Sequence, residues 1–351
     1  MKIKIITIHN IPNFGSIFQC LALCEYLKKI GYKNIEVINY NPDYFNANTF
    51  RAKIAKIINY KYYKRRTKKF NDFINKYIPV TSKSSKTLLE LKENESGADL
   101  YIVGGDQLWN VYHDCGRDDA YKLTWASGRK ISYGTSLGQT DFTDYQLQEL
   151  GKKIADLQYV AVRESSSVNL LKSVGIHAFH SVDPIFLLDR KDYEKYLLPI
   201  SQPRYLLVYL VTPSLLLEKC ISYLSKTYNL KVILCSGFSK KCTCDLFLKD
   251  LGPDEILSYI KNAEIVLSSS FHATSFSILF KKQFFTILPD VHTNERIEDL
   301  LRIQGLYNRI IKNDSDLENQ LSQNIDYTSI TNYYNKIADS KEYIKKAIEN
   351  D

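Results

Sequence analysis

A run of serines followed by a histidine is the stretch of this sequence best suited to chemistry. Residues 265–280 start with three apolar residues, continue through Ser268, Ser269 and Ser270, and carry apolar residues at helical spacing after His272. The pattern predicts a buried strand, a short loop and a helix. The first N–H groups of a helix lack intrahelical partners and the helix dipole is positive there, which suits a phosphate or carboxylate. His272 adds a group that titrates near neutral pH.

The same stretch also has a structural interpretation. Serine is a preferred residue at helix N-caps, and a lone histidine can be a satisfied, partly buried imidazole. The spacing of Ser270 and His272 therefore allows either an anion site or an ordinary helix start.

Length and composition indicate a globular protein of two domains. The chain has 351 residues, which is long for one hydrophobic core, and 44% of them are apolar while 25% are charged. The first residues enter a strand pattern at once, and no apolar run approaches the ~18 to 20 residues of a membrane span. We therefore expect neither a signal peptide nor a membrane anchor, and a cytoplasmic location.

The cysteines give no sign of a disulfide framework or a metal site. There are seven, without paired spacing, which fits reduced thiols in a reducing compartment. Cys242 and Cys244 form the one close pair, and no second pair of cysteines or histidines at zinc spacing accompanies them. We expect no metal.

Positive charge is concentrated in one segment. The net charge is +8, and residues 51–69 contain nine lysines and arginines with no acid. Isoleucines recur at helical spacing within this run, so it is typical of an amphipathic helix that meets an anionic membrane surface or a phosphorylated substrate. A solvated helix between core elements is the alternative. We do not expect nucleic acid as a partner, because no nucleic-acid-binding module accompanies the charge.

Strands and helices alternate along the chain in two series. The first begins with a strand at 4–9, a helix at 17–30 and a strand at 35–39; the second begins with a strand at 205–210. This alternation predicts an α/β protein with two Rossmann-like domains. We place the first domain at 1–195 and the second at 196–325, with a C-terminal helix at 326–351 folding back on the first.

Polar residues follow two strands of the predicted first domain. Asn13, Gly15 and Gln19 come after the first strand, and residues 104–110 come after a strand at 100–103. Asp106, Gln107 and Asn110 beside Trp109 suit a sugar, since polar groups and an aromatic platform are combined. The alternatives are plain turns, with Gln19 facing solvent and Trp109 in the core.

Two arginines lie at predicted strand–helix junctions or helix starts. Arg163 follows a strand at 159–162, and Arg296 precedes a helix at 297–303. A guanidinium offers a rigid fork of donors to an anion, whereas pairing with a structural carboxylate is the alternative.

Taken together, these segments resemble the polysaccharide pyruvyl transferase family. The matches occur in the family order and span nearly the whole chain: Asn13-Phe14-Gly15 with Gln19, residues 104–110, Val162-Arg163-Glu164, Val182-Asp183-Pro184, and Ser269-Ser270-Phe271-His272 with Phe276-Ser277.

The resemblance implies a fold similar to the glycosyltransferase B architecture, in which two Rossmann-like domains face a cleft. It implies that phosphoenolpyruvate binds there and that its pyruvyl group is transferred to two hydroxyls of a sugar as a ketal, in bacterial capsular, exo- or cell-wall polysaccharide biosynthesis. Phosphoenolpyruvate is a co-substrate, and no cofactor is implied.

The resemblance also suggests roles for individual residues. We assign His272 as the catalytic proton-transfer group and Asp106 as a base toward the attacking hydroxyl. The predicted donor-binding residues are Arg163, Ser268, Ser269, Ser270, Thr274 and Arg296. The predicted acceptor-binding residues are Asn13, Gly15, Gln19, Gly105, Gln107, Trp109 and Asn110.

Two departures from the family pattern stand out. Members with a Ser-x-Arg-Leu-His type motif have an arginine where this chain has Ser270, and we expect Arg296 or the helix N-terminus to replace it. Many relatives have serine at Gly105, a difference that we expect to matter little.

Two other function classes remain open. One is a nucleotide-sugar glycosyltransferase of the same architecture, and the other is a non-catalytic glycan-binding protein. The acceptor is a free glycan, a nucleotide sugar or a lipid-diphosphate-linked sugar, and the basic run at 51–69 favours the lipid-linked form at the inner membrane face.

Overall fold

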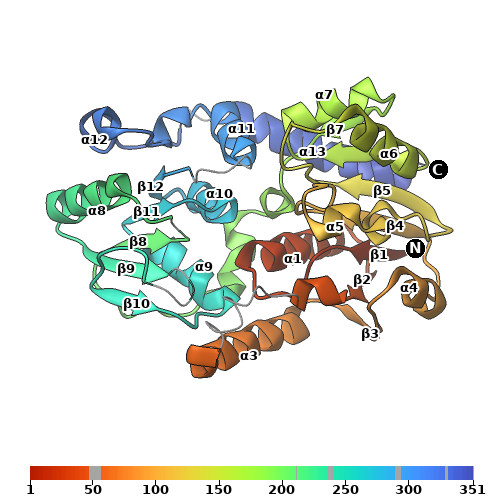
Figure 1. The fold of residues 1–351 in the computed structure, drawn as a ribbon, viewed down its shortest axis with the longest axis horizontal. Coiled ribbons are helices and arrows are strands. Elements are labelled where there is room, and N and C mark those ends of the chain that lie inside the picture. The colour runs from red at the N-terminus through yellow and green to blue at the C-terminus, as the bar shows by residue number, and fades with distance from the viewer. Residues whose placement is uncertain are drawn as a thin grey trace. The chain divides into compact units, whose positions relative to one another are not determined.

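The chain forms two compact α/β units in a computed structural model (Figure 1). Unit 1 comprises residues 1–47, 74–188 and 333–351, and unit 2 comprises residues 48–73 and 189–332. The structure describes residues 1–46, 57–210, 212–235, 237, 240–288, 294–328 and 331–350.

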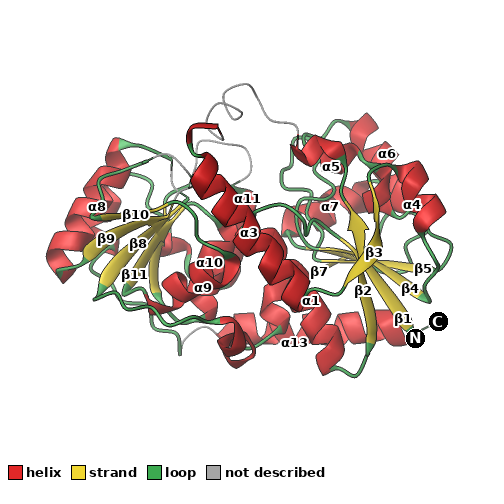
Figure 2. Cartoon of the chain, turned by 90° about the horizontal axis from the view of Figure 1, so that it is seen from below, coloured by secondary structure: helices red, strands yellow, loops and turns green. Residues whose placement is uncertain are grey.

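Unit 1 is built on a five-stranded parallel sheet in the order β3-β2-β1-β4-β5. Helices lie on both sides of this sheet (Figure 2). A short parallel pair, β6 and β7, follows in the chain. The elements are β1 (Lys2–Ile6), α1 (Phe14–Lys29), β2 (Asn34–Tyr40), β3 (Val80–Ser85), α4 (Leu88–Asn94), β4 (Leu100–Gly104), α5 (Asp114–Arg117), β5 (Arg129–Tyr133), α6 (Asp144–Ile154), β6 (Val160–Val162), α7 (Ser165–Ser173), β7 (Ala178–His180) and most of α13 (Thr331–Glu349).

Unit 2 repeats this plan with the parallel sheet β10-β9-β8-β11-β12. The alternate residues of β8, β9 and β11 that face α8 form one apolar core. The elements are most of α3 (Tyr60–Tyr77), β8 (Tyr205–Tyr209), α8 (Leu215–Tyr228), β9 (Lys231–Cys235), β10 (Leu246–Leu248), α9 (Pro253–Asn262), β11 (Ile265–Ser268), α10 (Phe271–Leu279), β12 (Gln283–Thr286), α11 (Glu295–Ile303) and α12 (Asp314–Gln320).

The C-terminal helix α13 packs on unit 1. Ser340 Oγ accepts a hydrogen bond from the Val182 N–H at 3.1 Å. The ring of Tyr343 stacks on that of Phe179 with centroids 4.2 Å apart. These two contacts join the C-terminal helix to unit 1.

Helix α3 packs on unit 2, although the sequence prediction places all of residues 1–195 in the first domain. Lys69 Nζ donates to both carboxylate oxygens of Glu255, at 2.7 and 2.8 Å. Arg65 Nε lies 2.6 Å from Asp250 Oδ2, and Phe73 contacts the ring of Tyr196. Arg65, Lys69 and Phe73 of this helix therefore have their partners in unit 2. Residues 51–56 of the basic run lie outside the described residues.

Within the described ranges, no helix combines the length and the apolar character needed to cross a bilayer.

Candidate functional site

The strands of unit 2 end in one row of paired residues. In the register of the sheet, Ser268 at the end of β11 pairs with Tyr209 of β8 and with Thr286 of β12. Tyr209 pairs in turn with Cys235 of β9. Ligands of parallel α/β sheets bind beyond the carboxyl ends of the strands, so this row marks the expected ligand edge of unit 2.

The serine loop after β11 is held by its own hydroxyl groups. Ser268 Oγ donates to the Tyr209 carbonyl at 2.8 Å and accepts from the Ser270 N–H at 2.9 Å. Ser270 caps α10, and its Oγ accepts from the Ala273 N–H at 3.4 Å. Ser269 Oγ is buried and makes no hydrogen bond to a described residue. The loop leads directly into the first turn of α10, where the helix dipole favours an anion.

His272 and Arg296 both lie against the ring of Phe271. The imidazole of His272 meets this ring edge-on, with centroids 5.1 Å apart, and His272 is 8% exposed. Arg296, on α11, places its guanidinium carbon 5.8 Å from the centroid of the same ring. The structure thus brings an imidazole and a cation to the first turn of α10, and their roles toward a ligand stay predictions.

Ser268 and Thr274, predicted to contact the donor, are enclosed in unit 2. Both side chains are buried, and Thr274 Oγ1 lies 3.1 Å from Thr286 Oγ1, which links α10 to the end of β12. We correct the prediction for these two residues and assign them to positioning the loop. Ser269 and Ser270 are partly exposed as residues, but the Ser269 hydroxyl is buried, so Ser270 remains the better candidate for donor binding.

The carboxyl edge of unit 1 brings Asp106 and Ser16 together. Asp106 follows β4, and Ser16, in the first turn of α1, donates to its Oδ2 at 2.5 Å. Asp106 has a φ of 62°, in the left-handed region that non-glycine residues rarely adopt. Asn13 caps α1 by accepting from the Gly15 N–H at 2.9 Å and is exposed. Backbone strain of this kind clusters at functional sites, which motivates keeping Asp106 as a candidate.

Three predicted acceptor-binding side chains are enclosed in unit 1. Trp109 is 0% exposed, and its indole N–H donates to the Tyr121 carbonyl at 2.8 Å. Gln19 is also 0% exposed. Asn110 is buried and donates to Gln107 Oε1 at 2.8 Å. We correct the prediction for these three residues, which stabilise the interior and the loop, and keep Asn13 and Gln107 as accessible candidates.

Gly105 packs directly on Gln19. Its φ is +60°, and a Cβ atom at this position would lie 1.6 Å from Gln19 Oε1. The expectation that a serine here would matter little is therefore wrong for this chain, because the added side chain meets a buried glutamine.

We expect Gly105→Ser to lower the free energy of unfolding by about 1–3 kcal/mol, the usual cost of overpacking. Gly97→Ser is the matched control, since Gly97 also has a positive φ of +82° but open space around its Cβ position. Urea denaturation followed by circular dichroism measures both variants. Equal losses in the two would mean that strain alone, and not contact with Gln19, sets the cost.

Arg163 forms ion pairs with two carboxylates inside unit 1. Its Nη1 lies 2.5 Å from Asp183 Oδ2, its Nε lies 3.5 Å from Glu164 Oε1, and all three side chains are buried. Burial lowers the pKa of the guanidinium, but the two carboxylates raise it, and the net shift is upward. The geometry favours the structural alternative, and we assign Arg163 to a buried ion-pair network instead of donor binding.

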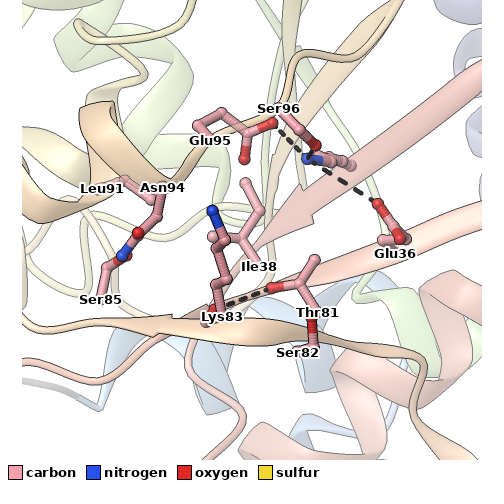
Figure 3. A pocket seen from close by; sticks show the side chains of 11 residues that line it. Glu36, Ile38, Thr81, Ser82, Lys83, Ser85, Leu91, Asn94, Glu95 and Ser96 are labelled. Carbon is pink, nitrogen blue, oxygen red and sulfur yellow. Dashed lines mark hydrogen bonds and ion pairs between the residues drawn. The ribbon is translucent and has the colours of Figure 1, made fainter.

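A separate polar cavity of about 180 Å³ lies in unit 1 beside α4 (Figure 3). Lys4, from β1, donates to Ser96 Oγ at 3.1 Å and forms an ion pair with Glu95. Lys4 also lies 3.9 Å from Glu36 in the lining of this cavity, and no predicted site residue lines it. We assign it no part in the chemistry. Among the described residues, no group of three or more His, Cys, Asp or Glu is placed to hold a metal ion.

Three solved structures of similar fold carry a nucleotide sugar in their names or as a bound ligand. The Methanocaldococcus jannaschii UDP-GlcNAc 2-epimerase in complex with UDP-GlcNAc and UDP has a TM-score of 0.53 and 15% identity, covering 92% of this chain and 93% of that one. A putative UDP-N-acetylglucosamine 2-epimerase from Listeria monocytogenes has a TM-score of 0.54 and 10% identity, covering 99% and 91%. Arabidopsis thaliana UGT89C1 complexed with UDP-L-rhamnose has a TM-score of 0.53 and 9% identity, covering 99% and 97%. At these identities the likeness concerns the fold alone, which is the predicted pair of Rossmann-like units similar to the glycosyltransferase B architecture.

The family of this chain follows from a comparison of its sequence with protein-family models. A search of curated proteins gives no match to this chain. The model of the polysaccharide pyruvyl transferase family matches residues 13–291, a segment that runs from the N-cap of α1 to beyond β12. It contains Asp106 and His272 and ends before Arg296. This match covers most of the chain, and the protein belongs to the polysaccharide pyruvyl transferase family.

Proposed function

We propose that this protein transfers the pyruvyl group of phosphoenolpyruvate to two hydroxyls of a sugar as a ketal, in the biosynthesis of a bacterial polysaccharide. Membership of the family supports the transferase class. One observation carries the donor site: the imidazole of His272 and the guanidinium of Arg296 meet the same Phe271 ring at the N-terminus of α10.

The proposed donor site matches the charges of phosphoenolpyruvate. This donor has a carboxylate and a phosphate, so it needs cations and oriented N–H groups. Arg296 supplies a cation, and the first turn of α10 supplies N–H groups at the positive end of a helix dipole. Ser270 adds a hydroxyl group at the same helix start.

The proposed reaction begins with a proton placed on the methylene carbon of phosphoenolpyruvate. His272 in its imidazolium form gives this proton, which leaves an oxocarbenium-like centre at C2. A first sugar hydroxyl adds there, phosphate leaves, and a second hydroxyl closes the ketal. Asp106, the proposed base, takes one of the two hydroxyl protons, which then leaves with the phosphate, and the other hydroxyl proton restores the imidazolium. Arg296 and the helix N–H groups stabilise the negative charge of the donor.

We keep Asp106 as the proposed base toward the acceptor hydroxyl. Asp106 is partly exposed, and its carboxylate accepts hydrogen bonds from the Ser16 hydroxyl and from the Gln107 N–H at 2.8 Å. A carboxylate held by two donors keeps one orientation, which a base needs. Asn13 and Gln107 are the accessible neighbours proposed to bind the sugar.

Ligand-dependent stability separates this proposal from its rivals. We expect phosphoenolpyruvate at about 100 times its Kd to raise the melting temperature by roughly 5 °C or more, because it binds the folded state alone. UDP serves as the comparison ligand in the same thermal-shift assay. Stabilisation by UDP without phosphoenolpyruvate would favour a nucleotide-sugar glycosyltransferase, and stabilisation by neither would favour a glycan-binding protein.

We propose further that the acceptor is linked to a lipid diphosphate at the inner membrane face. Lys61, Lys64 and Lys68 of α3 are exposed, and such lysines are attracted to anionic lipid. The double variant Lys61→Glu/Lys64→Glu should therefore bind anionic liposomes at least about tenfold more weakly in a sedimentation assay.

The matched control for the liposome assay is Lys345→Glu/Lys346→Glu, which reverses two exposed lysines of α13. It makes the same change in net charge on unit 1. If both double variants bind liposomes as the parent protein does, the membrane contact through α3 is not made.

A further inference from the structure

The loop that follows β5 joins two strand ends at the carboxyl edge of unit 1. Thr135 Oγ1, in this loop, donates to the Val103 carbonyl near the end of β4, at 3.3 Å. The Thr135 carbonyl accepts from the Arg163 N–H, just beyond β6, at 3.1 Å. The loop after β5 therefore connects β6 to the strand that Asp106, the proposed base, directly follows.

Ser136, the next residue of this loop, bonds the backbone of residues 105–110, the Asp106 loop, at two points. Its N–H donates to the Asp106 carbonyl at 2.9 Å, and its carbonyl accepts from the Trp109 N–H at 3.2 Å. Asp106 has a φ of 62°, a conformation that is unfavourable for a non-glycine residue and persists only where the surrounding structure fixes it. The two bonds to Ser136 are part of what fixes it.

The Ser136 side chain ties this contact to a buried carboxylate. Its hydroxyl donates to Glu164 Oε1. Glu164 Oε2 accepts from the Ser167 hydroxyl at 3.0 Å, and Glu164 Oε1 lies 3.5 Å from Arg163 Nε. Ser136, Glu164 and Ser167 are each at most 1% exposed, so water does not compete for these bonds. The Glu164 carboxylate is therefore held in one orientation, and it fixes the Ser136 hydroxyl.

Close packing also limits any movement of the loop after β5. Gly138 has a φ of +77°, and a Cβ atom there would lie 2.6 Å from Gln107 Oε1, in the Asp106 loop. Gly134 has a φ of +66°, and a Cβ atom there would lie 2.9 Å from Pro184 Cδ. Because neither contact leaves space to absorb a displacement, a shift of the loop after β5 is transmitted to the Asp106 loop.

We propose that Ser136, held by Glu164, is a positioning residue that keeps the Asp106 carboxylate in the orientation needed to take the proton of the acceptor hydroxyl. The inference rests on the proposed function, in which Asp106 is the base. Ser136 acts through the Asp106 backbone and not by contact with the sugar. The carboxylate itself accepts from the Ser16 hydroxyl and the Gln107 N–H, and the bond to Ser136 fixes the backbone from which the carboxylate extends.

Two matched variants test this role. Ser136→Ala and Ser167→Ala each remove one hydroxyl from Glu164, and of these two serines only Ser136 is bonded to the Asp106 loop. Ser136→Ala should lower kcat by about 10- to 100-fold, since a misplacement of about 1 Å can cost 10²-fold, whereas Ser167→Ala should keep the parent kcat. The rise in melting temperature caused by phosphoenolpyruvate should be unchanged in both, because the proposed donor-binding residues belong to unit 2.

A double-mutant cycle with Asp106→Asn separates positioning from a general loss of structure. If Ser136 acts through Asp106, adding Ser136→Ala to Asp106→Asn should lower kcat little further. Ser136→Cys keeps a weak donor in a side chain of similar shape and should retain part of the parent kcat. This variant replaces Ser136→Ala in the cycle if a thermal melt shows that the alanine variant does not fold.

The outcomes are distinguishable. Equal kcat values for Ser136→Ala and Ser167→Ala, or independent losses in the double-mutant cycle, would overturn the positioning role and leave Asp106 as the base. Full activity of Asp106→Asn would show that the base is another group, and the role of Ser136 would be lost with it. If the parent protein transfers no pyruvyl group, the proposed function fails and this role fails with it.

Discussion

Replacing His272 by alanine should lower kcat for pyruvyl transfer by about 10²- to 10⁴-fold, the usual contribution of a positioned acid or base. The imidazole lies in the first turn of α10 edge-on to the Phe271 ring, and the guanidinium carbon of Arg296 lies 5.8 Å from the centroid of the same ring. Its loss removes the proposed proton donor to the methylene carbon but leaves the donor-binding cation in place. Steady-state kinetics with phosphoenolpyruvate measures the effect.

The control for this variant is His177→Ala, which removes an exposed imidazole from unit 1. It should keep full activity. A thermal melt of His272→Ala should resemble that of the parent protein, which separates lost chemistry from lost folding. Full transfer activity in a folded His272→Ala protein would remove the catalytic role.

Replacing Arg163 by methionine should destabilise unit 1 by about 3–5 kcal/mol, the cost of breaking a buried ion pair. The change leaves the buried carboxylates of Asp183 and Glu164 without their shared guanidinium. Urea denaturation of the free protein, followed by circular dichroism, measures the loss.

The variant Asp183→Asn tests the same ion-pair network by removing the carboxylate charge that pairs with Arg163. Asp183 also caps the turn that begins at Pro184, by accepting from the Ile185 N–H at 3.0 Å, and an asparagine can keep this bond. The loss should therefore be in the same direction as for Arg163→Met. Unchanged stability of Arg163→Met, together with a raised KM for phosphoenolpyruvate, would restore the donor-binding role that the sequence predicts.

Much of the fold follows from local patterns in the sequence; two of the differences have local causes, and one depends on residues distant in the chain. The apolar pattern places the first helix at 17–30, whereas α1 begins at Phe14 because Asn13 caps it by accepting from the Gly15 N–H. Strand β10 has three residues, too few to produce a period in the sequence. The packing of α3 on unit 2 depends on Asp250 and Glu255, and no local pattern connects these acids to a helix so distant in the chain.

The sequence predicts where the candidate site lies in the fold, but it does not predict which side chains there are buried and which are accessible. The strand, serine loop and helix at 265–280 correspond to β11, its loop and α10. Which serine faces the interior depends on the register with Tyr209, and this assigns Ser268 to the sheet edge. Trp109 has the same residue type whether it binds a sugar or fills a core, so burial alone could decide.

Product analysis tests the central claim most directly. The protein would be incubated with phosphoenolpyruvate and a panel of lipid-linked galactose, glucose and N-acetylhexosamine acceptors, with mass spectrometry of the products and an assay for phosphate. We predict an acceptor that gains one pyruvate less one water, with one phosphate released for each product. An unmodified panel, or phosphate released without any adduct, would contradict ketal formation from this donor.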